Sequence, residues 1–256
     1  MVGDIAIVKL RPEARGRETE AAEAILKEMK SVRCVYGQEG GIEGDYRLRK
    51  LRHLGGEERT VTTHKENGIR LRVDVVTCYF SPRLSTERLR IAGKISPGEK
   101  VLNMFAGVGP YSILIAKKTS VWSCEVNHAA VEFHVENNRL NKVEDRVTMI
   151  EGDAMSLPET LSGERFDRVL MPHPSQSDRF LPAASALLAP GGVAYYYRHS
   201  TGEDEGEAEG HLREEVGRVA PELSVDSVRR VRLVGPRFVE LVAEMRKGPT
   251  LRAQQA

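Results

Sequence analysis

The segment from Val101 to Tyr111 contains the residues of this chain with the clearest chemical use. An apolar run leads into Gly107 and Gly109 and then into Pro110, a residue that suits the first turn of a helix. Glycines at a strand-to-helix turn let the backbone approach a ligand, and the helix N-terminus offers free N–H groups. A dinucleotide fingerprint needs a third glycine where this chain has Ser112, so NAD is disfavoured. The segment is either a structural turn or the binding turn of another nucleoside cofactor.

Two acidic residues favour the second interpretation. Residues 121–125 read as a strand ending at Glu125, about where a ribose-binding carboxylate lies in such folds. Residues 146–150 read as the next strand, and Asp153 after it could accept a hydrogen bond from an adenine amino group. Each acid alone could be a solvated loop residue. Because the carboxyl ends of parallel strands share one edge of a sheet, the pair predicts a nucleoside site there.

Composition indicates a compact protein without a global charge signal. The 256 residues include 38 Lys and Arg against 37 acidic residues, so any basic surface must be local. The three cysteines, Cys34, Cys78 and Cys124, are dispersed, which fits a reducing compartment rather than a disulfide framework. We find no secretory signal and no apolar run of membrane-spanning length. The expected location is the cytoplasm, with no membrane association.

The N-terminal third predicts a small α+β module over residues 1–79. We expect a strand at 3–8, a helix at 17–32 with Met29 among its core residues, and a Gly-rich turn at 37–44. Two runs that alternate polar and apolar residues, 59–64 and 68–75, flank the Asn-Gly hairpin signal at Asn67 and Gly68.

The remainder, residues 80–256, alternates strand and helix from Lys94 onward. This order predicts an α/β fold, a Rossmann-like parallel sheet with helices on both faces. Asn127 is the expected N-cap of one helix, and the acidic run from Glu203 reads as a solvated helix face. The later expected elements are a strand at 166–171, a helix at 180–188, a strand at 192–198, a helix at 203–219 and two strands flanking Gly235-Pro236.

Several motifs together resemble one enzyme family over nearly the whole chain. They include Ser81-Pro82-Arg83-Leu84-Ser85-Thr86-Glu87-Arg88, the residues Met104 to Tyr111, and the segments 44–49, 64–68 and 137–142. The combination is similar to the archaeal and eukaryotic tRNA guanine-37 N1-methyltransferases, a class I family that depends on S-adenosylmethionine. The resemblance implies transfer of the cofactor's methyl group to N1 of the guanine 3′ of the anticodon, with the tRNA anticodon stem-loop as partner.

The resemblance also implies roles for individual residues. Glu87 matches the general base that removes the N1 proton, and the arginine that stabilises charge on O6 is Arg47 or, close behind, Arg49. Both roles require the small module to fold over a flipped base. The residues expected to bind the cofactor are Arg88 at its methionine end, Gly107, Gly109, Glu125 at the ribose, Asp153 and Ala154 at the adenine, and Phe105, Val126 and Pro172. No metal is expected.

The chain departs from the family pattern at three places. Asn103 replaces an acid, and Pro172-His173-Pro174 replaces an Asn-Leu-Pro element, which removes an asparagine associated with orienting guanine. His173 is then either a shaped loop residue or a participant in the transfer. The sequence also begins where the family's middle domain begins, so we expect the separate N-terminal domain to be absent.

Other functions and contacts remain open. A related wybutosine-pathway enzyme transfers the aminocarboxypropyl group of the same cofactor, and another alternative is methylation of a wyosine intermediate. A third is a tRNA-binding relative without activity. Basic residues at 47–52 and 229–237 are either solvated or contact phosphate. A monomer is the expected state.

Overall fold

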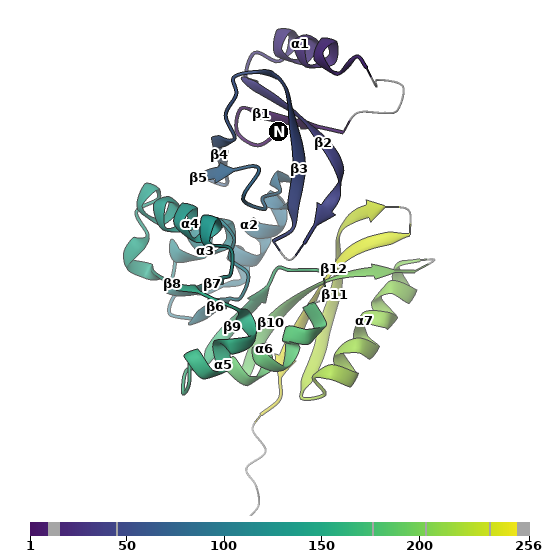
Figure 1. The fold of residues 1–256 in the computed structure, drawn as a ribbon. Coiled ribbons are helices and arrows are strands. Elements are labelled where there is room, and N and C mark those ends of the chain that lie inside the picture. Colours follow the sequence, from purple (N-terminus) through teal and green to yellow (C-terminus); the bar gives the residue numbers. More distant parts are fainter. Residues whose placement is uncertain (10–15, 45, 176, 203, 236, 250–256) are drawn as a thin grey trace, which may run out of the picture.

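The computed structural model describes residues 1–9, 16–44, 46–175, 177–202, 204–235 and 237–249. Its centre is a seven-stranded sheet in the order β11-β12-β10-β9-β6-β7-β8, here called the large sheet. A three-stranded sheet, β1-β2-β3, lies above it in Figure 1 and is called the N-terminal sheet. A separate hairpin, β4-β5, lies beside α3 and α4. Asp45, Glu203 and Pro236, which belong to segments quoted above, lie outside the described residues.

The large sheet has the predicted parallel core. Strands β6 to β10 run parallel, whereas β12 is antiparallel to β10 and β11 is antiparallel to β12. Their bounds are β6 (Val101–Asn103), β7 (Val121–Glu125), β8 (Val147–Glu151), β9 (Phe166–Met171), β10 (Leu188–Thr201), β11 (Leu223–Gly235) and β12 (Phe238–Lys247). The α/β expectation for this region is confirmed.

Helices cover both faces of the large sheet because its strand residues alternate between two apolar clusters. Val101 belongs to the first cluster and Leu102 to the second, as expected for side chains with a period of two. The first cluster includes α2 (Ser85–Lys94), α3 (Pro110–Ala116) and α4 (His128–Leu140), and the second includes α5 (Leu157–Thr160), α6 (Leu181–Leu187) and α7 (Glu205–Val219). Short 3-10 turns are η2 (Pro82–Leu84), η3 (Glu144–Arg146), η4 (Ala154–Ser156) and η5 (Ser177–Phe180).

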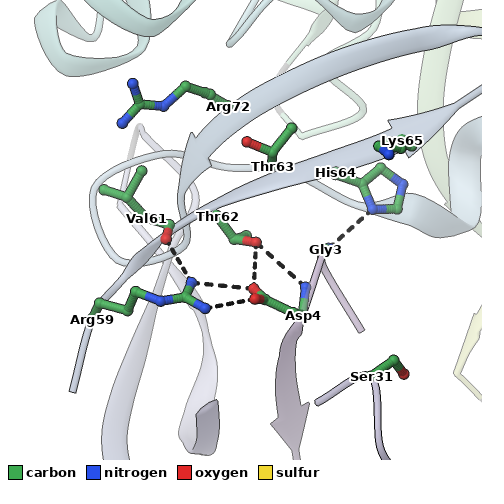
Figure 2. Close-up of a pocket in the computed structure, with 10 residues that line it drawn as sticks. All are labelled: Gly3, Asp4, Ser31, Arg59, Val61, Thr62, Thr63, His64, Lys65 and Arg72. Atoms are coloured by element: carbon green, nitrogen blue, oxygen red, sulfur yellow. Dashed lines mark hydrogen bonds and ion pairs between the residues drawn. The ribbon is translucent and has the colours of Figure 1, made fainter. Parts of the chain in front are cut away.

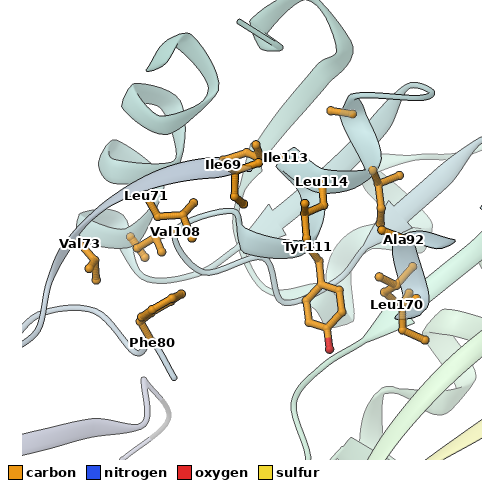
Figure 3. Packing of buried hydrophobic residues seen from close by; sticks show 14 of the residues in the cluster. Ile69, Leu71, Val73, Phe80, Ala92, Val108, Tyr111, Ile113, Leu114 and Leu170 are labelled. Carbon is orange, nitrogen blue, oxygen red and sulfur yellow. The ribbon is translucent and has the colours of Figure 1, made fainter. Parts of the chain in front are cut away.

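The hairpin of β4 (Val61–Glu66) and β5 (Ile69–Asp74) packs on the first cluster. Its turn residues Asn67 and Gly68 have φ values of 47° and 73°, which confirms the Asn-Gly hairpin. Figure 3 shows Ile69 and Leu71 of β5 against Ile113 and Val108 at α3 and the glycine turn. The hairpin therefore shares its core with the large sheet, and the boundary near residue 80 stays a prediction.

Asn137 of α4 and Asn141, the residue that follows this helix, hold the edge of β5 as a neighbouring strand would. The Arg72 N–H donates to Asn137 Oδ1 at 2.6 Å, and Asn137 Nδ2 donates back to the Arg72 carbonyl at 2.9 Å. Asn141 makes the same pair of bonds with Arg70, at 2.9 and 2.6 Å. Asn137 is fully buried and also donates to the Val108 carbonyl at 3.0 Å. The segment 137–142 thus fixes the hairpin to the glycine turn.

The N-terminal sheet has its own small core and differs from the prediction in two details. It consists of β1 (Ile5–Val8), α1 (Glu18–Glu28), β2 (Cys34–Glu43) and β3 (Leu48–Gly56). The expected Gly-rich turn at 37–44 is wrong, because most of it is strand β2, with a bulge between Glu39 and Ile42 that accommodates two glycines. The helix ends at Glu28, so Met29 is 42% exposed rather than in the core.

A polar joint connects the N-terminal sheet to the hairpin, beside a cavity of about 830 Å³ (Figure 2). The Arg59 guanidinium donates to both oxygens of Asp4, at 3.1 and 2.5 Å, and Thr62 Oγ1 donates to Asp4 at 2.7 Å. The Gly3 N–H donates to His64 Nδ1 at 3.1 Å. Hydrogen bonding to Arg59 is the main cause that lowers the pKa of Asp4. These groups satisfy one another, so we interpret the joint as structural.

Candidate active site

A second cavity, of about 1220 Å³, lies between the carboxyl ends of the parallel strands and the N-terminal sheet. Nine of the twelve residues predicted for the site line it: Arg47, Arg49, Phe105, Gly107, Glu125, Val126, Asp153, Ala154 and Pro172. The sheet edge chosen from the sequence is therefore the wall of a cavity. We call the part formed by Phe105, Gly107, Glu125, Val126, Asp153 and Ala154 the acidic end, and the part formed by Arg47, Arg49, Tyr79, Arg83, His173 and Arg232 the basic end.

Glu125 organises the acidic end through the backbone around it. Its Oε2 accepts from the Gly107 N–H at 2.7 Å, and its Oε1 accepts from Val126 and Asn127 at 3.1 and 2.9 Å. Burial raises the pKa of the Glu125 carboxyl, and the three backbone donors oppose that effect. The carboxylate is consequently held in a fixed position at the end of β7, where its free lone pairs can accept from a ligand hydroxyl.

The two glycines of the turn have different tasks. Gly107, with φ of 52°, lines the cavity and donates to Glu125. Gly109, with φ of 93°, precedes α3 and does not line the cavity. A Cβ at Gly109 would lie 2.6 Å from Cδ2 of the fully buried His134. The structure therefore assigns Gly109 to close packing, and its expected contact with a cofactor stays a prediction.

Asn103 bonds to the glycine loop as a neutral amide. Phe105 N–H donates to its Oδ1 at 3.4 Å, and its Nδ2 donates to Ser112 Oγ at 3.0 Å. Ser123 Oγ donates to the same hydroxyl at 2.8 Å. Asn103 is fully buried. These hydrogen bonds therefore hold the glycine loop through a neutral side chain, where an acid would place a buried charge at the end of β6.

Asp153 closes the acidic end at the start of η4. Its Oδ1 accepts from the Met155 N–H at 2.9 Å, so the side chain caps the turn and leaves its other oxygen available. Phe105 packs edge-on against Phe180, with ring centroids 4.8 Å apart. Two carboxylates and an apolar wall of this kind suit a nucleoside with ribose hydroxyls and an amino-bearing base.

Arg47 joins the N-terminal sheet to the basic end. It lies in the β2–β3 turn with φ of 56° and is 8% exposed. Its Nη1 donates to Ser175 Oγ at 2.8 Å, across 128 positions of sequence, and its guanidinium lies over the Tyr79 ring at 4.9 Å. Within the part of the chain that the structure describes, its buried Nε has no hydrogen-bond partner. The Arg47–Ser175 hydrogen bond therefore places the N-terminal sheet against the cavity, as the small module was expected to lie.

Arg49 belongs to a cluster of positive charge. Its guanidinium also lies over the Tyr79 ring, 5.5 Å from the ring centroid. Burial lowers the pKa of Arg49, and the positive charges of Arg83, Arg232 and Arg47 act in the same direction. Arg83 is exposed and Arg232 donates to Glu240 at 2.6 Å, so Arg47 and Arg49 supply most of the positive charge inside the cavity, and that charge suits an anionic or electron-rich ligand.

His173 lies in this cavity after β9, beside the arginines. Its ring centroid is 5.0 Å from that of Phe105, and its buried Nδ1 has no hydrogen-bond partner among the described residues. Burial, followed by the positive charge of Arg47, lowers the pKa of His173 to about 4. The imidazole is therefore neutral near pH 7.

Glu87 and Arg88 do not line the cavity. Glu87 is 5% exposed and accepts four hydrogen bonds, two from Arg90 at 2.8 Å, one from Tyr197 at 2.8 Å and one from Arg229 at 3.2 Å. The role of Glu87 as a base stays a prediction.

Arg88 donates to both oxygens of Glu66 at 2.6 Å and to the Ser81 carbonyl at 3.1 Å. It is 2% exposed, so in this structure it fixes the hairpin to the Ser81-Pro82 segment of the cavity wall. Its expected contact with the cofactor stays a prediction.

Sequence reasoning missed several residues of the wall. Arg83 stands inside the Ser-Pro-Arg motif, so its place in that motif was a usable signal. Arg179 and His199 had no signal, because they reach the cavity only through the packing of η5 and β10. None of the helices in the described ranges is long and apolar enough to cross a membrane.

Comparisons with known proteins show which family this chain resembles in sequence. The TRM5/TYW2 methyltransferase domain matches residues 62–223, and the TYW2 N-terminal domain matches residues 1–60. A tRNA (guanine(37)-N(1))-methyltransferase Trm5b of Pyrococcus abyssi is 38% identical over 96% of this chain and 73% of its own. A tRNA(Phe) (4-demethylwyosine(37)-C(7)) aminocarboxypropyltransferase of Pyrococcus horikoshii is 36% identical over 77% of this chain and 69% of its own.

The fold comparison agrees. The complex of aTrm5 with tRNALeu matches with a TM-score of 0.86 and 32% identity, over 97% of this chain and 71% of that one. The strand order, the cavity at the carboxyl ends of the strands and the sequence matches all lead to one conclusion. The chain belongs to the TRM5/TYW2 methyltransferase family.

Proposed function

We propose that the protein transfers the methyl group of S-adenosylmethionine to N1 of guanine 37 in tRNA. The observation that carries this proposal is the Arg47–Ser175 contact, which brings a buried arginine of the N-terminal sheet into the cavity that also holds Glu125 and Asp153. One cavity thereby offers carboxylates for a nucleoside cofactor and positive charge for the carbonyl oxygen of a second ligand.

The acidic end fits S-adenosylmethionine. Glu125 would accept from the ribose hydroxyls, Asp153 from the adenine amino group, and Phe105 with Ala154 would pack against the apolar surface of the nucleoside. When bound, the cofactor supplies an electrophilic methyl group. The tight backbone bonding of Glu125 keeps this end preorganised, so little ordering is needed on binding.

The basic end fits the flipped base of a tRNA. N1 of guanine carries a proton, and as N1 attacks the methyl group that proton must leave while charge on O6 is stabilised. Arg47, whose side chain lines the cavity, offers a guanidinium donor for O6. Glu87 would receive the proton after exchanging a bond with Arg229, whose side chain is 54% exposed and therefore the most easily displaced of its partners.

Two further statements belong to the proposal. The protein acts as a monomer that contacts the anticodon stem-loop, and it works in the cytoplasm. The three free, buried cysteines support a reducing compartment.

A second candidate is transfer of the aminocarboxypropyl group of the same cofactor. The observation in its favour is the match of residues 1–60 to the TYW2 N-terminal domain, together with the 36% identity to the P. horikoshii aminocarboxypropyltransferase. The motif around Glu87 favours methyl transfer. Methylation at N1 of guanine requires a base that removes the N1 proton, and Glu87 is the candidate for that base.

The test uses two labelled forms of the cofactor, each with unmodified tRNA and with tRNA that carries 4-demethylwyosine at position 37. One carries deuterium in the methyl group and the other carries ¹³C in the aminocarboxypropyl chain. Nucleoside mass spectrometry should find 1-methylguanosine at position 37 with the deuterium label only. Incorporation of ¹³C would support the second candidate, and no incorporation with either label would contradict both.

A further inference from the structure

Among the described residues, one aromatic side chain is exposed, and it lies at the cavity. Tyr46, in the turn between β2 and β3, is 47% exposed and lines the cavity. Within the same ranges, every other Phe, Trp and Tyr is buried or half-buried. Because Tyr46 both lines the cavity and faces solvent, it stands at the cavity mouth. Tyrosine suits such a place, because its ring is apolar while its hydroxyl stays hydrated.

The turn holds this ring in place. The Arg47 N–H donates to the Gly44 carbonyl at 3.1 Å, which closes the turn. The Arg47 side chain continues into the cavity, where it donates to Ser175 at 2.8 Å. In the described part of the chain, the Tyr46 side chain has no hydrogen bond and no contact with another ring or with a guanidinium. The turn is therefore anchored through Arg47, and the exposed part of the Tyr46 ring is open to a ligand.

The other aromatic rings near the arginines are already covered. Phe80 and Tyr111 are only 2% and 4% exposed. The Tyr79 ring has the guanidinium groups of Arg47 and Arg49 over it, at 4.9 and 5.5 Å from its centroid. Of these rings, Tyr46 is therefore the one that a ligand arriving from solvent can reach.

Exposed apolar and basic side chains line the same cavity. Met1 and Val234 are exposed apolar residues in its wall, and Arg83 and Arg179 are exposed basic residues in its wall. Proteins bind single-stranded nucleic acid with this combination, because bases stack on an aromatic ring and phosphates lie against positive charge. The cavity mouth therefore fits an RNA strand that extends beyond the base inside the cavity.

A flipped guanine creates a need for such a ring. When guanine 37 leaves the anticodon loop, each of its two neighbouring bases loses a stacking partner, and this loss is part of the cost of flipping. An aromatic ring that takes the vacant place restores one of the two stacks. The ring accepts any base, since every base has a π face.

We propose that Tyr46 stacks on a nucleobase adjacent to the flipped guanine 37 of the tRNA. This inference rests on the proposed function and adds a contact beyond the target base. Because stacking is tolerant of sequence, Tyr46 contributes affinity without restricting which nucleotide lies next to guanine 37.

The experiment measures tRNA affinity in the presence of S-adenosylhomocysteine, which has no methyl group to transfer. Three tRNAs are compared: the intact one, one without the base 5′ of guanine 37, and one without the base 3′ of it. Tyr46→Ala should weaken binding of the intact tRNA by about 5- to 150-fold, the range for one base stacked on an aromatic ring. On one of the two abasic tRNAs it should cause no further loss, and on the other it should cause the full loss. Tyr46→Phe keeps the ring and should bind as the normal protein does.

The control is Met29→Ala. Met29 is 42% exposed, as an apolar residue of the same N-terminal region, but it does not line the cavity. This variant should bind all three tRNAs as the normal protein does.

A second arm uses the normal protein alone, so it does not depend on the folding of a variant. A tRNA with 5-iodouridine on the 5′ side or on the 3′ side of guanine 37 is irradiated on the protein, and the cross-linked peptide is identified by mass spectrometry. One of the two positions should cross-link to Tyr46.

Equal losses of Tyr46→Ala on all three tRNAs, or no loss on the intact tRNA, would overturn the inference. So would cross-links from both positions to residues other than Tyr46. If the normal protein forms no 1-methylguanosine on the intact tRNA with S-adenosylmethionine, the proposed function fails. Methylation together with one of the contrary results overturns the inference alone.

Discussion

The acidic and basic ends of one cavity are built in opposite ways. At the acidic end, Glu125 already accepts three backbone N–H bonds and Asp153 caps a turn, so the polar groups are fixed before any ligand arrives. At the basic end, Nε of Arg47 and Nδ1 of His173 are buried without a partner among the described residues, and several arginines lie near one another. The polar groups of the first end are held by the chain itself, whereas two of those at the second end are not. This difference predicts that changes at the basic end affect chemistry, whereas changes at the acidic end affect cofactor binding.

The largest effect is expected at Glu87. If Glu87 accepts the N1 proton, Glu87→Gln should slow single-turnover methyl transfer by roughly 10² to 10⁴ without changing the affinity for cofactor or tRNA. Rapid chemical-quench experiments with saturating cofactor measure the rate of this single turnover. Glu244→Gln is the matched control, because Glu244 also binds Arg90, at 2.8 Å, and is not a candidate base. Equal losses in the two variants would mean that Glu87 only holds Arg90.

Arg47 should give the next largest effect. Arg47→Ala removes the donor at O6 and should slow the same step on the order of 10² to 10³, by analogy with a lost oxyanion donor. Arg52→Ala serves as comparison, since Arg52 lies on β3 and pairs with Glu39 outside the cavity. A loss that appears only in tRNA affinity, with normal transfer at saturation, would assign Arg47 to phosphate binding.

A smaller change is expected at the acidic end. Asp153→Ala should weaken S-adenosylmethionine binding by about 1.5 to 3 kcal/mol, the range for a hydrogen bond to a charged group. Calorimetry measures this without tRNA. Glu151→Ala, at the end of the same strand but paired with His128 on the surface, should bind normally. If Asp153→Ala binds S-adenosylmethionine with unchanged affinity, Asp153 does not contact the cofactor.

The last prediction concerns the pH dependence of stability and does not involve a ligand. Burial lowers the pKa of His134 to about 4 from 6.5, so the unfolded chain binds more protons than the folded one between these values. The free energy of unfolding should therefore fall as the pH is lowered from 6.5 towards 4. His173 acts in the same direction, whereas the exposed His128, whose pKa is raised by Glu151, opposes it. Urea unfolding of His134→Gln should show a shallower dependence, and an identical slope would contradict the assignment.

The contrast between the acidic and basic ends also explains which site residues could be predicted from the sequence. Glu125 and Asp153 stand directly after strands, so periodicity and spacing were enough to place them at one sheet edge. Asn67-Gly68 likewise specified its turn locally. The basic end depends on contacts such as Arg47 with Ser175, which no local pattern encodes. The Gly-rich segment 37–44 was misassigned for a related reason, because pairing with β3 decides that it forms a strand.

Three predicted residues show the same dependence on packing. Glu87 and Arg88 belong to a motif that the sequence identifies, yet their side chains lie in buried ion pairs behind the wall. Gly109 belongs to the predicted turn, but the neighbour that requires a glycine there is His134 of α4. Motif spacing predicts that such residues lie near a site, and only the tertiary contacts say which atoms face it.

The most direct test of the account is a structure of the protein with an unreactive S-adenosylmethionine analogue and an anticodon stem-loop. The account predicts the nucleoside of the analogue at Glu125 and Asp153, and guanine 37 flipped into the basic end with O6 at Arg47 and N1 towards the analogue's reactive end. A guanine 37 that stays stacked in the loop, or one bound with N1 facing Arg47, would contradict it.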